Sequence, residues 1–418
     1  MLLLLPGCAG LYRHSIATED FALYGDYDPE RLQATGKFLE KVIRAYRREF
    51  PEHADSIPPP RVVFDESRLS RQQIFTSEPR QEGYYLPIFR LIRLSPQYIG
   101  NGGEDAQTVI FHELAHHFLI SAYPKTNSRY WLNEGFACIM EVSFFDANGE
   151  LVTPFYHPWL HRQALRALGE LGPRDFLKEV ERISASSWLS YHRSSEKARN
   201  YAISWAMFDL LLNSTHGTLE QRLETILGWN HQQTLERMQD LPGHILVSPE
   251  HRLHELAGNP DTRYWALDQW LEIPLPRAPM LLPHLLSLMQ EGSSPWERAR
   301  GCQLLTRVLN SQLRGLSPRQ RRQYRRLLAE RLRSGRPEER QAVANSLTAG
   351  GRDARYLRPL IAMLDEEDPD SRAAAARALA RLEPKRTIVR PAFWRQAPEA
   401  ERHREIREWQ VWLQRQHR

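Results

Sequence analysis

The chain has 418 residues and a mass of 48.8 kDa, which exceeds one small module and predicts two or three domains. Its composition, 41% hydrophobic and 26% charged, argues against an integral membrane protein, because no run of about 18 apolar residues occurs. A formal net charge of +5 is too small to indicate a dedicated nucleic-acid binder, so we expect no nucleic-acid partner.

The first cysteine follows a short apolar run, Leu2–Leu5, and the pair Pro6-Gly7. This pattern resembles the end of a bacterial lipoprotein signal, in which the cysteine, here Cys8, carries lipid. Residues 1–18 would then be the remnant of a signal and a tether, and the true start would lie upstream of Met1. The protein would belong to the cell envelope and face the periplasm, and only the lipid would attach it to the membrane. No basic segment precedes the run, so an ordinary apolar N-terminus of a cytoplasmic protein is the alternative.

The next part of the chain predicts an α+β domain. Apolar residues at helical spacing between 21 and 50 predict one amphipathic helix, which Pro51 ends. Strands are expected at 61–64 and, without interruption, at 84–94.

Mostly helical elements follow. Helices are expected at 105–122, 133–145, 200–212, 219–227 and 262–271. The Asn148-Gly149 pair predicts a tight turn between 142–145 and 151–152. Three prolines between 274 and 279 predict a linker that ends the domain, whose expected bounds are 19–273.

The remainder of the chain repeats a pattern of proline, arginine and leucine. Pro295, Pro337 and Pro369 each open a predicted helix and precede a leucine by ten residues. Apolar helices are expected before each of them, at 281–289, 324–332 and 356–364. The pattern predicts an all-α solenoid of helix pairs over 278–390, capped by a helix within 391–418. Its concave surface favours a protein partner, and the arginines of 314–340 are interpreted as a solvated face.

The last of these repeats, residues 368–379, is similar to the second helix of a HEAT repeat. Its run of small residues, Ala373–Ala376, allows close helix packing. The resemblance implies HEAT-like repeats in this part of the chain.

An H-E-x-x-H motif lies on the helix expected at 105–122. His112 and His116 are one turn apart on one helix face, so both imidazoles can bind one zinc ion while Glu113 stays beside it. A pair of histidines at this spacing also occurs on polar helix surfaces that bind no metal.

A second motif supplies the missing ligand. The string Trp131–Ala137 contains Glu134, and 17 residues separate it from His116, which suits two helices joined by a loop. Two histidines and one glutamate leave the fourth position of zinc open for water, as in catalytic sites. These ligands favour zinc over other divalent metals without excluding them.

Together the two motifs resemble the gluzincin branch of the zincin metallopeptidases, in which aminopeptidases carry nearly the same Trp-Leu-Asn-Glu-Gly-Phe-Ala string. The resemblance implies a zincin-like fold, one zinc ion and a peptide or protein substrate. It also implies that Glu113 takes the proton of a zinc-activated water. Tyr201 matches a tyrosine whose phenol stabilises the oxyanion in that family, and a buried structural tyrosine is the alternative.

The sequence also departs from the aminopeptidase pattern. The gap of 17 residues is one short, and the strand whose glutamate grips a substrate amine is absent, so we expect an endopeptidase. The stretch 83–90, with Tyr85 and Leu86, is the candidate edge strand for an extended substrate, or else a plain sheet strand.

The surroundings of the zinc histidines differ from the family as well. Cys138 stands where thermolysin-like relatives place an acid that orients a zinc histidine, so Glu141 or His117 is expected to take that role. His157 and His161 are expected to face solvent rather than to line a pocket.

A second function remains open at this stage. The alternative is a HEAT-repeat scaffold protein of the cell envelope, in which the zinc domain is non-catalytic or weakly active. The intact Glu113 argues against this alternative, because a scaffold has no physical need for a general base.

Overall fold

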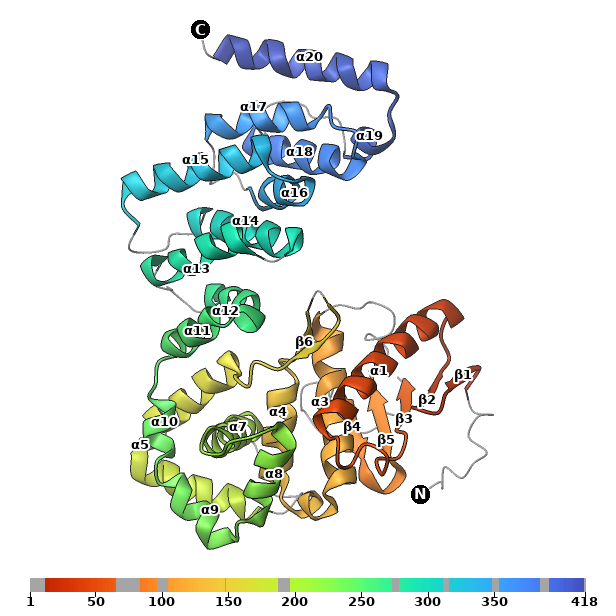
Figure 1. Ribbon diagram of the computed structural model, residues 1–418, viewed down its shortest axis with the longest axis vertical. Coiled ribbons are helices and arrows are strands. Elements are labelled where there is room, and N and C mark those ends of the chain that lie inside the picture. The colour runs from red at the N-terminus through yellow and green to blue at the C-terminus, as the bar shows by residue number, and fades with distance from the viewer. Residues whose placement is uncertain are drawn as a thin grey trace. The chain divides into compact units, whose positions relative to one another are not determined.

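The computed structural model divides the chain into two compact units, Met1–Pro249 and Glu250–Arg418 (Figure 1). The sequence predicts a domain that ends near residue 273. The structure describes the following residues: 12–64, 83–95, 104–146, 148–186, 196–272, 278–292, 294–310, 316–347, 353–383 and 391–416. Cys8, most of the expected tether and most of the expected linker lie outside them.

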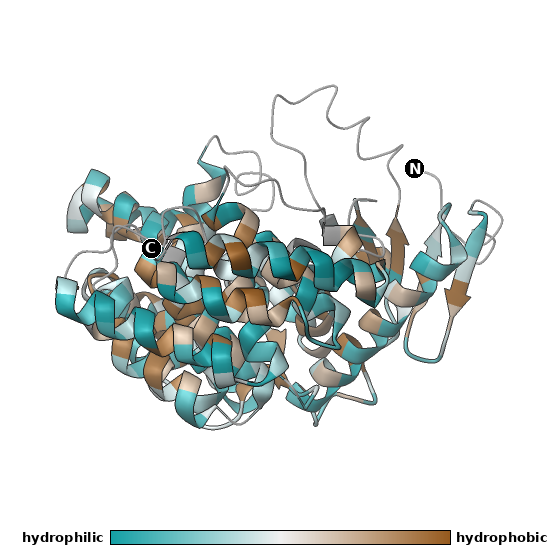
Figure 2. Ribbon diagram, turned by 90° about the horizontal axis from the view of Figure 1, so that it is seen from above, coloured by the Kyte–Doolittle hydropathy of each residue, from teal (hydrophilic) through white to brown (hydrophobic). Residues whose placement is uncertain are grey.

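The first unit contains a five-stranded sheet in the order β1-β2-β3-β5-β4. Strand β1 is antiparallel to β2, the pairs β2–β3 and β3–β5 are parallel, and β4 returns antiparallel to β5 at the edge. The strands are β1 (His14–Ala17), β2 (Ala22–Gly25), β3 (Arg61–Phe64), β4 (Gly83–Leu86) and β5 (Leu91–Leu94). Hydrophobic residues predominate in the central strands, which are buried (Figure 2).

Two predictions for this region are corrected. The expected strand 84–94 is two strands joined by the 3₁₀ turn η2 (Pro87–Phe89), after which Arg90 has a positive φ of 49°. The expected helix over 21–50 is preceded by β2 and begins only at Pro29, where the Asp28 side chain accepts the Glu30 N–H. In both places a proline marks the change of backbone direction.

Helices cover the sheet and form the rest of the first unit. Helix α1 packs on β1 and β2, whereas α3 packs on β4, β5 and α1. The helices are α1 (Pro29–Glu49), α3 (Glu104–Ala122), η4 (Pro124–Ser128), α4 (Tyr130–Met140), α5 (Pro158–Ser184), α7 (Lys197–Asn213), α8 (Leu219–Gly228), α9 (His231–Met238) and α10 (Leu241–Ile245). The sequence patterns do not predict α5, α9 or α10.

The region between α4 and α5 forms a small hairpin. Helix α4 ends at Met140 rather than at residue 145, and β6 (Phe144–Phe145) pairs antiparallel with β7 (Leu151–Val152). Gly149 has a φ of +83° in the turn, which confirms the turn that the sequence predicts there.

The second unit is helical in the part of the chain that the structure describes. Helix α13 packs on α14, α15 on α16 and α17 on α18, and α14, α16 and α18 follow one another in contact. The helices are α11 (Pro249–Gly258), α12 (Pro260–Glu272), α13 (Ala278–Glu291), α14 (Pro295–Asn310), α15 (Pro318–Ser334), α16 (Pro337–Ser346), α17 (Ala354–Met363), α18 (Pro369–Leu382), α19 (Pro391–Gln396) and α20 (Glu399–Gln416).

Helices α4 and α7 approach closely at Gly135. A Cβ atom there would lie 2.5 Å from the Ser204 carbonyl oxygen and 2.6 Å from Cβ of Phe208. Only glycine therefore permits this packing, and Gly135 directly follows Glu134 in the chain.

We expect Gly135→Ala to lower the free energy of unfolding by about 1–3 kcal/mol, because α7 must move away from α4. Chemical denaturation of the full chain measures the change. Gly169→Ala is the matched control, since an added Cβ on α5 meets nothing within 4 Å. Equal stability of the two variants would contradict the close packing.

Candidate metal centre

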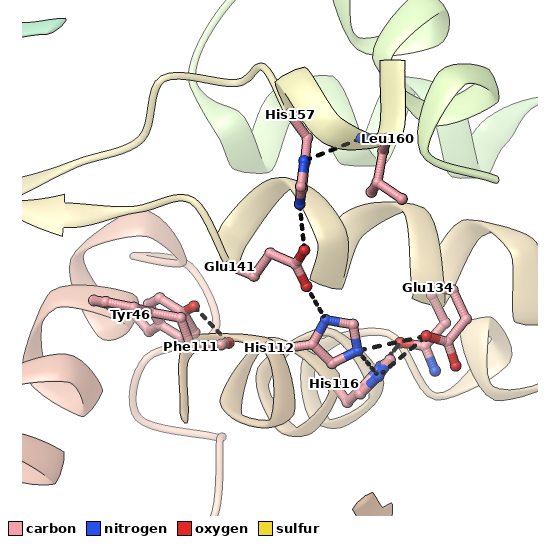
Figure 3. Close-up of polar contacts among 9 residues, drawn as sticks. Tyr46, Phe111, His112, His116, Glu134, Glu141, His157 and Leu160 are labelled. Carbon is pink, nitrogen blue, oxygen red and sulfur yellow. Dashed lines mark hydrogen bonds and ion pairs between the residues drawn. The ribbon is translucent and has the colours of Figure 1, made fainter. Parts of the chain in front are cut away.

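Three side chains from α3 and α4 converge on one point (Figure 3). The Nε2 atoms of His112 and His116 lie 3.2 Å apart. Oε2 of Glu134 lies 3.5 Å from the first and 3.6 Å from the second. His116 and Glu134 are buried, and the His112 side chain is 14% exposed.

The triangle of these atoms fits a tetrahedral metal. Ligands at zinc distances of 2.0–2.1 Å lie roughly 3.3–3.4 Å from one another in a regular tetrahedron. The three observed separations are close to this value. The residues that the sequence singles out as ligands are thus arranged so that they could hold one metal ion.

Hydrogen bonds on the far side of each imidazole leave Nε2 able to bind a metal. Nδ1 of His116 lies 2.9 Å from Oδ1 of Asn133, an oxygen that only accepts, so Nδ1 donates. Nδ1 of His112 lies 2.8 Å from Oε2 of Glu141 and donates to it. Each Nε2 therefore presents its lone pair to the centre of the triangle.

Of the two orienting partners that the sequence suggests, the structure places Glu141 at the site and His117 elsewhere. Nε2 of His117 donates to the Pro58 carbonyl oxygen at 2.8 Å, and its Nδ1 lies 3.1 Å from the Tyr85 hydroxyl. Burial lowers the pKa of His117 to about 4, which keeps this imidazole neutral. His117 therefore ties α3 to the sheet.

Negative charge gathers at the triangle. Burial alone would raise the pKa of Glu141, but His157 and His112 outweigh it and lower the pKa to about 2. Burial lowers the pKa of His112, whereas the carboxylates of Glu134 and Glu141 raise it and prevail. The raised pKa reflects the carboxylates that surround this imidazole, and a buried divalent cation would compensate the same negative charge.

Glu113 stands beside the triangle without joining it. Its side chain is buried, and Oε2 has no hydrogen-bond partner among the described residues. Burial raises the pKa of Glu113 to about 8, with His112 opposing the shift and Glu134 adding to it. A buried carboxyl group with an unpaired oxygen is costly for stability.

The edge strand β4 begins at this carboxylate. A Cβ on Gly83 would lie 3.1 Å from Cγ of Glu113. Tyr85 and Leu86 follow on the same strand and are half-buried. The Tyr85 hydroxyl is occupied by His117, and burial raises its pKa to about 12, so Tyr85 acts in this structure as a packed side chain.

Tyr201 lies on the first turns of α7 and faces the site. Its ring centroid is 6.5 Å from that of His112, and the ring is half-buried. Lys197 precedes it by one turn, with Nζ 5.9 Å from the centre of the Tyr201 ring. The structure therefore brings Tyr201 beside the ligands, as the sequence predicts.

The sequence predicts that two histidines near the start of α5 face solvent, and the structure corrects this. His161 is 2% exposed; its Nδ1 lies 2.7 Å from the Tyr156 hydroxyl and its Nε2 donates to the Ile245 carbonyl oxygen. His157 contacts Glu141 at 2.5 Å (Figure 3). The sequence reasoning also missed Asn133, although the residue stands next to Glu134 in the motif.

A second group of ligand atoms, from His112, Cys138 and Glu141, overlaps the first. The 2.8 Å between Nδ1 of His112 and Oε2 of Glu141 is a hydrogen-bond distance, shorter than the roughly 3.3 Å between two ligands of one metal. Cys138 is 1% exposed, and burial raises the pKa of its thiol. We therefore interpret this group as a support for His112.

Comparisons with protein-family models, with curated proteins and with solved structures found no match to this chain. Among the residues that the structure describes, no helix has the length and apolar character to cross a membrane. The assignment of the site therefore depends on its own geometry.

A buried hydrogen bond ties α3 to α1 one residue before His112. The Tyr46 hydroxyl donates to the Phe111 carbonyl oxygen at 2.8 Å. We expect Tyr46→Phe to lower the free energy of unfolding by about 0.5–1.5 kcal/mol, as measured by urea denaturation. Tyr24→Phe, which alters a half-buried ring on β2, is the control; an equal effect of both changes would contradict the importance of this bond.

Proposed function

We propose that this chain is a gluzincin-type zinc metallopeptidase that cleaves internal bonds of a peptide or protein substrate. The supporting observation is the triangle of His112, His116 and Glu134 with the buried Glu113 carboxyl beside it. A purely structural metal site has no use for that carboxyl, and structural zinc sites take a fourth protein ligand.

In this proposal His112, His116 and Glu134 hold the zinc ion. Bound zinc would acidify a water molecule and polarise the substrate carbonyl. Glu113 takes a proton at its unused carboxylate oxygen and passes it to the leaving amine. The Tyr201 hydroxyl donates a hydrogen bond to the oxygen that becomes negatively charged.

Strand β4 offers a way to align an extended substrate. It is the edge strand in the described part of the sheet, and it starts at Gly83 against Glu113. A substrate strand added to this edge would place its backbone along Tyr85 and Leu86. Edge pairing needs no free amine on the substrate, which favours cleavage of internal bonds.

For the rest of the chain the proposal follows the sequence patterns. Residues 19–273 form the zincin-like domain, 278–390 are HEAT-like repeats that bind a protein partner, and residues within 391–418 cap them. Lipid on Cys8 anchors the protein in the bacterial envelope, and a cytoplasmic protein is the alternative. Mass analysis of the N-terminus distinguishes the two.

The metal and the chemistry are tested together on the full chain, Glu134→Ala and Glu113→Gln. We expect about one zinc ion per chain in the wild type and in Glu113→Gln, and less in Glu134→Ala, by elemental mass spectrometry. Casein hydrolysis should fall by about 10²–10⁴-fold in Glu113→Gln. Zinc without turnover in the wild type would favour the scaffold function, and no zinc in any sample would refute the proposal.

Tyr201→Phe separates the tyrosine's chemical role from packing. We expect kcat to fall by about 10²–10³-fold with little change in KM, because the hydroxyl acts on the transition state. Zinc content and thermal stability serve as controls and should stay at wild-type values. An unchanged kcat would assign Tyr201 a structural role.

A further inference from the structure

Helix α5 begins with an unusual N-cap residue. His157 is the N-cap, Pro158 occupies the first helical position, and Nδ1 of His157 accepts the Leu160 backbone N–H at 3.3 Å. Ser, Thr, Asp and Asn are the preferred N-cap residues, and histidine is not among them. A residue that breaks a local preference usually meets a second requirement.

The second requirement is visible on the other side of the ring. A backbone N–H can only donate, so Nδ1 of His157 carries no proton and the neutral ring holds its proton on Nε2. This Nε2 lies 2.5 Å from Oε1 of Glu141 and donates to it. The N-terminus of α5 thereby determines which nitrogen of His157 faces the carboxylate.

Glu141 is held between two imidazoles. Its Oε1 accepts from His157 and its Oε2 from His112, whose Nε2 belongs to the triangle (Figure 3). The side chains of Glu141 and His157 are 18% and 14% exposed, so water has little access to either contact. With both oxygens engaged, the carboxylate cannot rotate about its own axis, and its direction determines that of the His112 ring.

We propose that His157 is a positioning residue for the metal centre: it orients Glu141, and through Glu141 it fixes the tautomer and direction of His112. The inference rests on the proposed function, since it presumes that the triangle binds zinc. The site then includes a chain of contacts: the backbone of α5 holds His157, His157 holds Glu141, and Glu141 holds the ligand His112. Serine or asparagine would cap α5 without reaching Glu141.

Two substitutions divide the two roles of His157. Asparagine at this position keeps a good N-cap but is too short to reach Glu141, whereas glutamine has an N–H donor at about the reach of Nε2 and is a poor cap. The measurement is the zinc Kd of the full chain, stripped of metal and titrated against a chromophoric chelator. The Tm of the same metal-free samples, from thermal unfolding, measures how well each residue caps helix α5.

We expect His157→Asn to weaken zinc binding about 10–100-fold while the Tm of the metal-free protein stays near wild type. His157→Gln should retain most of the zinc affinity and lose a few degrees of Tm. His161→Gln controls for general loosening of α5, because His161 contacts Tyr156 and Ile245 instead of the metal site. It should lower the Tm with zinc affinity retained.

Two results would overturn the inference. One is wild-type zinc affinity in His157→Asn. The other is equal weakening in the asparagine and glutamine variants that follows their loss of stability, which would leave His157 with the role of a helix cap alone. Absence of zinc binding by the wild type is a different outcome, because it refutes the proposed function and the inference with it.

Discussion

The geometry of the site depends on the close packing of three helices, α3, α4 and α7, around the position where the ligand atoms converge. The H-E-x-x-H spacing places two imidazoles on one face of α3, but it does not supply the carboxylate. Helix α4 brings Glu134 to that face, and α4 itself is held against α7 at a glycine where no side chain fits. The same contact carries Tyr201 of α7 to the ligands. Packing of α3, α4 and α7 is therefore the constraint from which the geometry of the triangle follows.

Hydrogen bonds then convert a cluster of polar groups into a set of oriented ligands. Asn133 and Glu141 each accept the Nδ1–H of one imidazole, so the nitrogen that faces the centre is the basic one in both rings. Glu113 stands beside these ligands, is buried, and has one oxygen without a hydrogen-bond partner among the described residues. In a buried site this oxygen is available for a proton, which is the property that the proposed hydrolysis needs.

Local patterns predicted much of this arrangement, and the misses have physical causes. The pairing of His112 with His116 follows from helical periodicity and the Asn148-Gly149 turn from backbone preference, because both are local rules. Glu134 lies on another helix, and its part in the site is predicted from the motif Trp131–Ala137 and its resemblance to gluzincins. The sequence pattern does not predict the break at Pro87, because apolar and aromatic residues continue on both sides of it. His157 and His161 were placed in solvent, since their partners Glu141 and Ile245 come from other elements and only the tertiary fold joins them.

The central claim is that one metal ion binds in the triangle of His112, His116 and Glu134. X-ray absorption at the zinc edge of the zinc-loaded chain tests it directly. The account predicts nitrogen and oxygen neighbours at about 2.0–2.1 Å, with imidazole scattering from two histidines and no sulfur. A sulfur neighbour at about 2.3 Å would show that a cysteine binds the ion and would contradict the account.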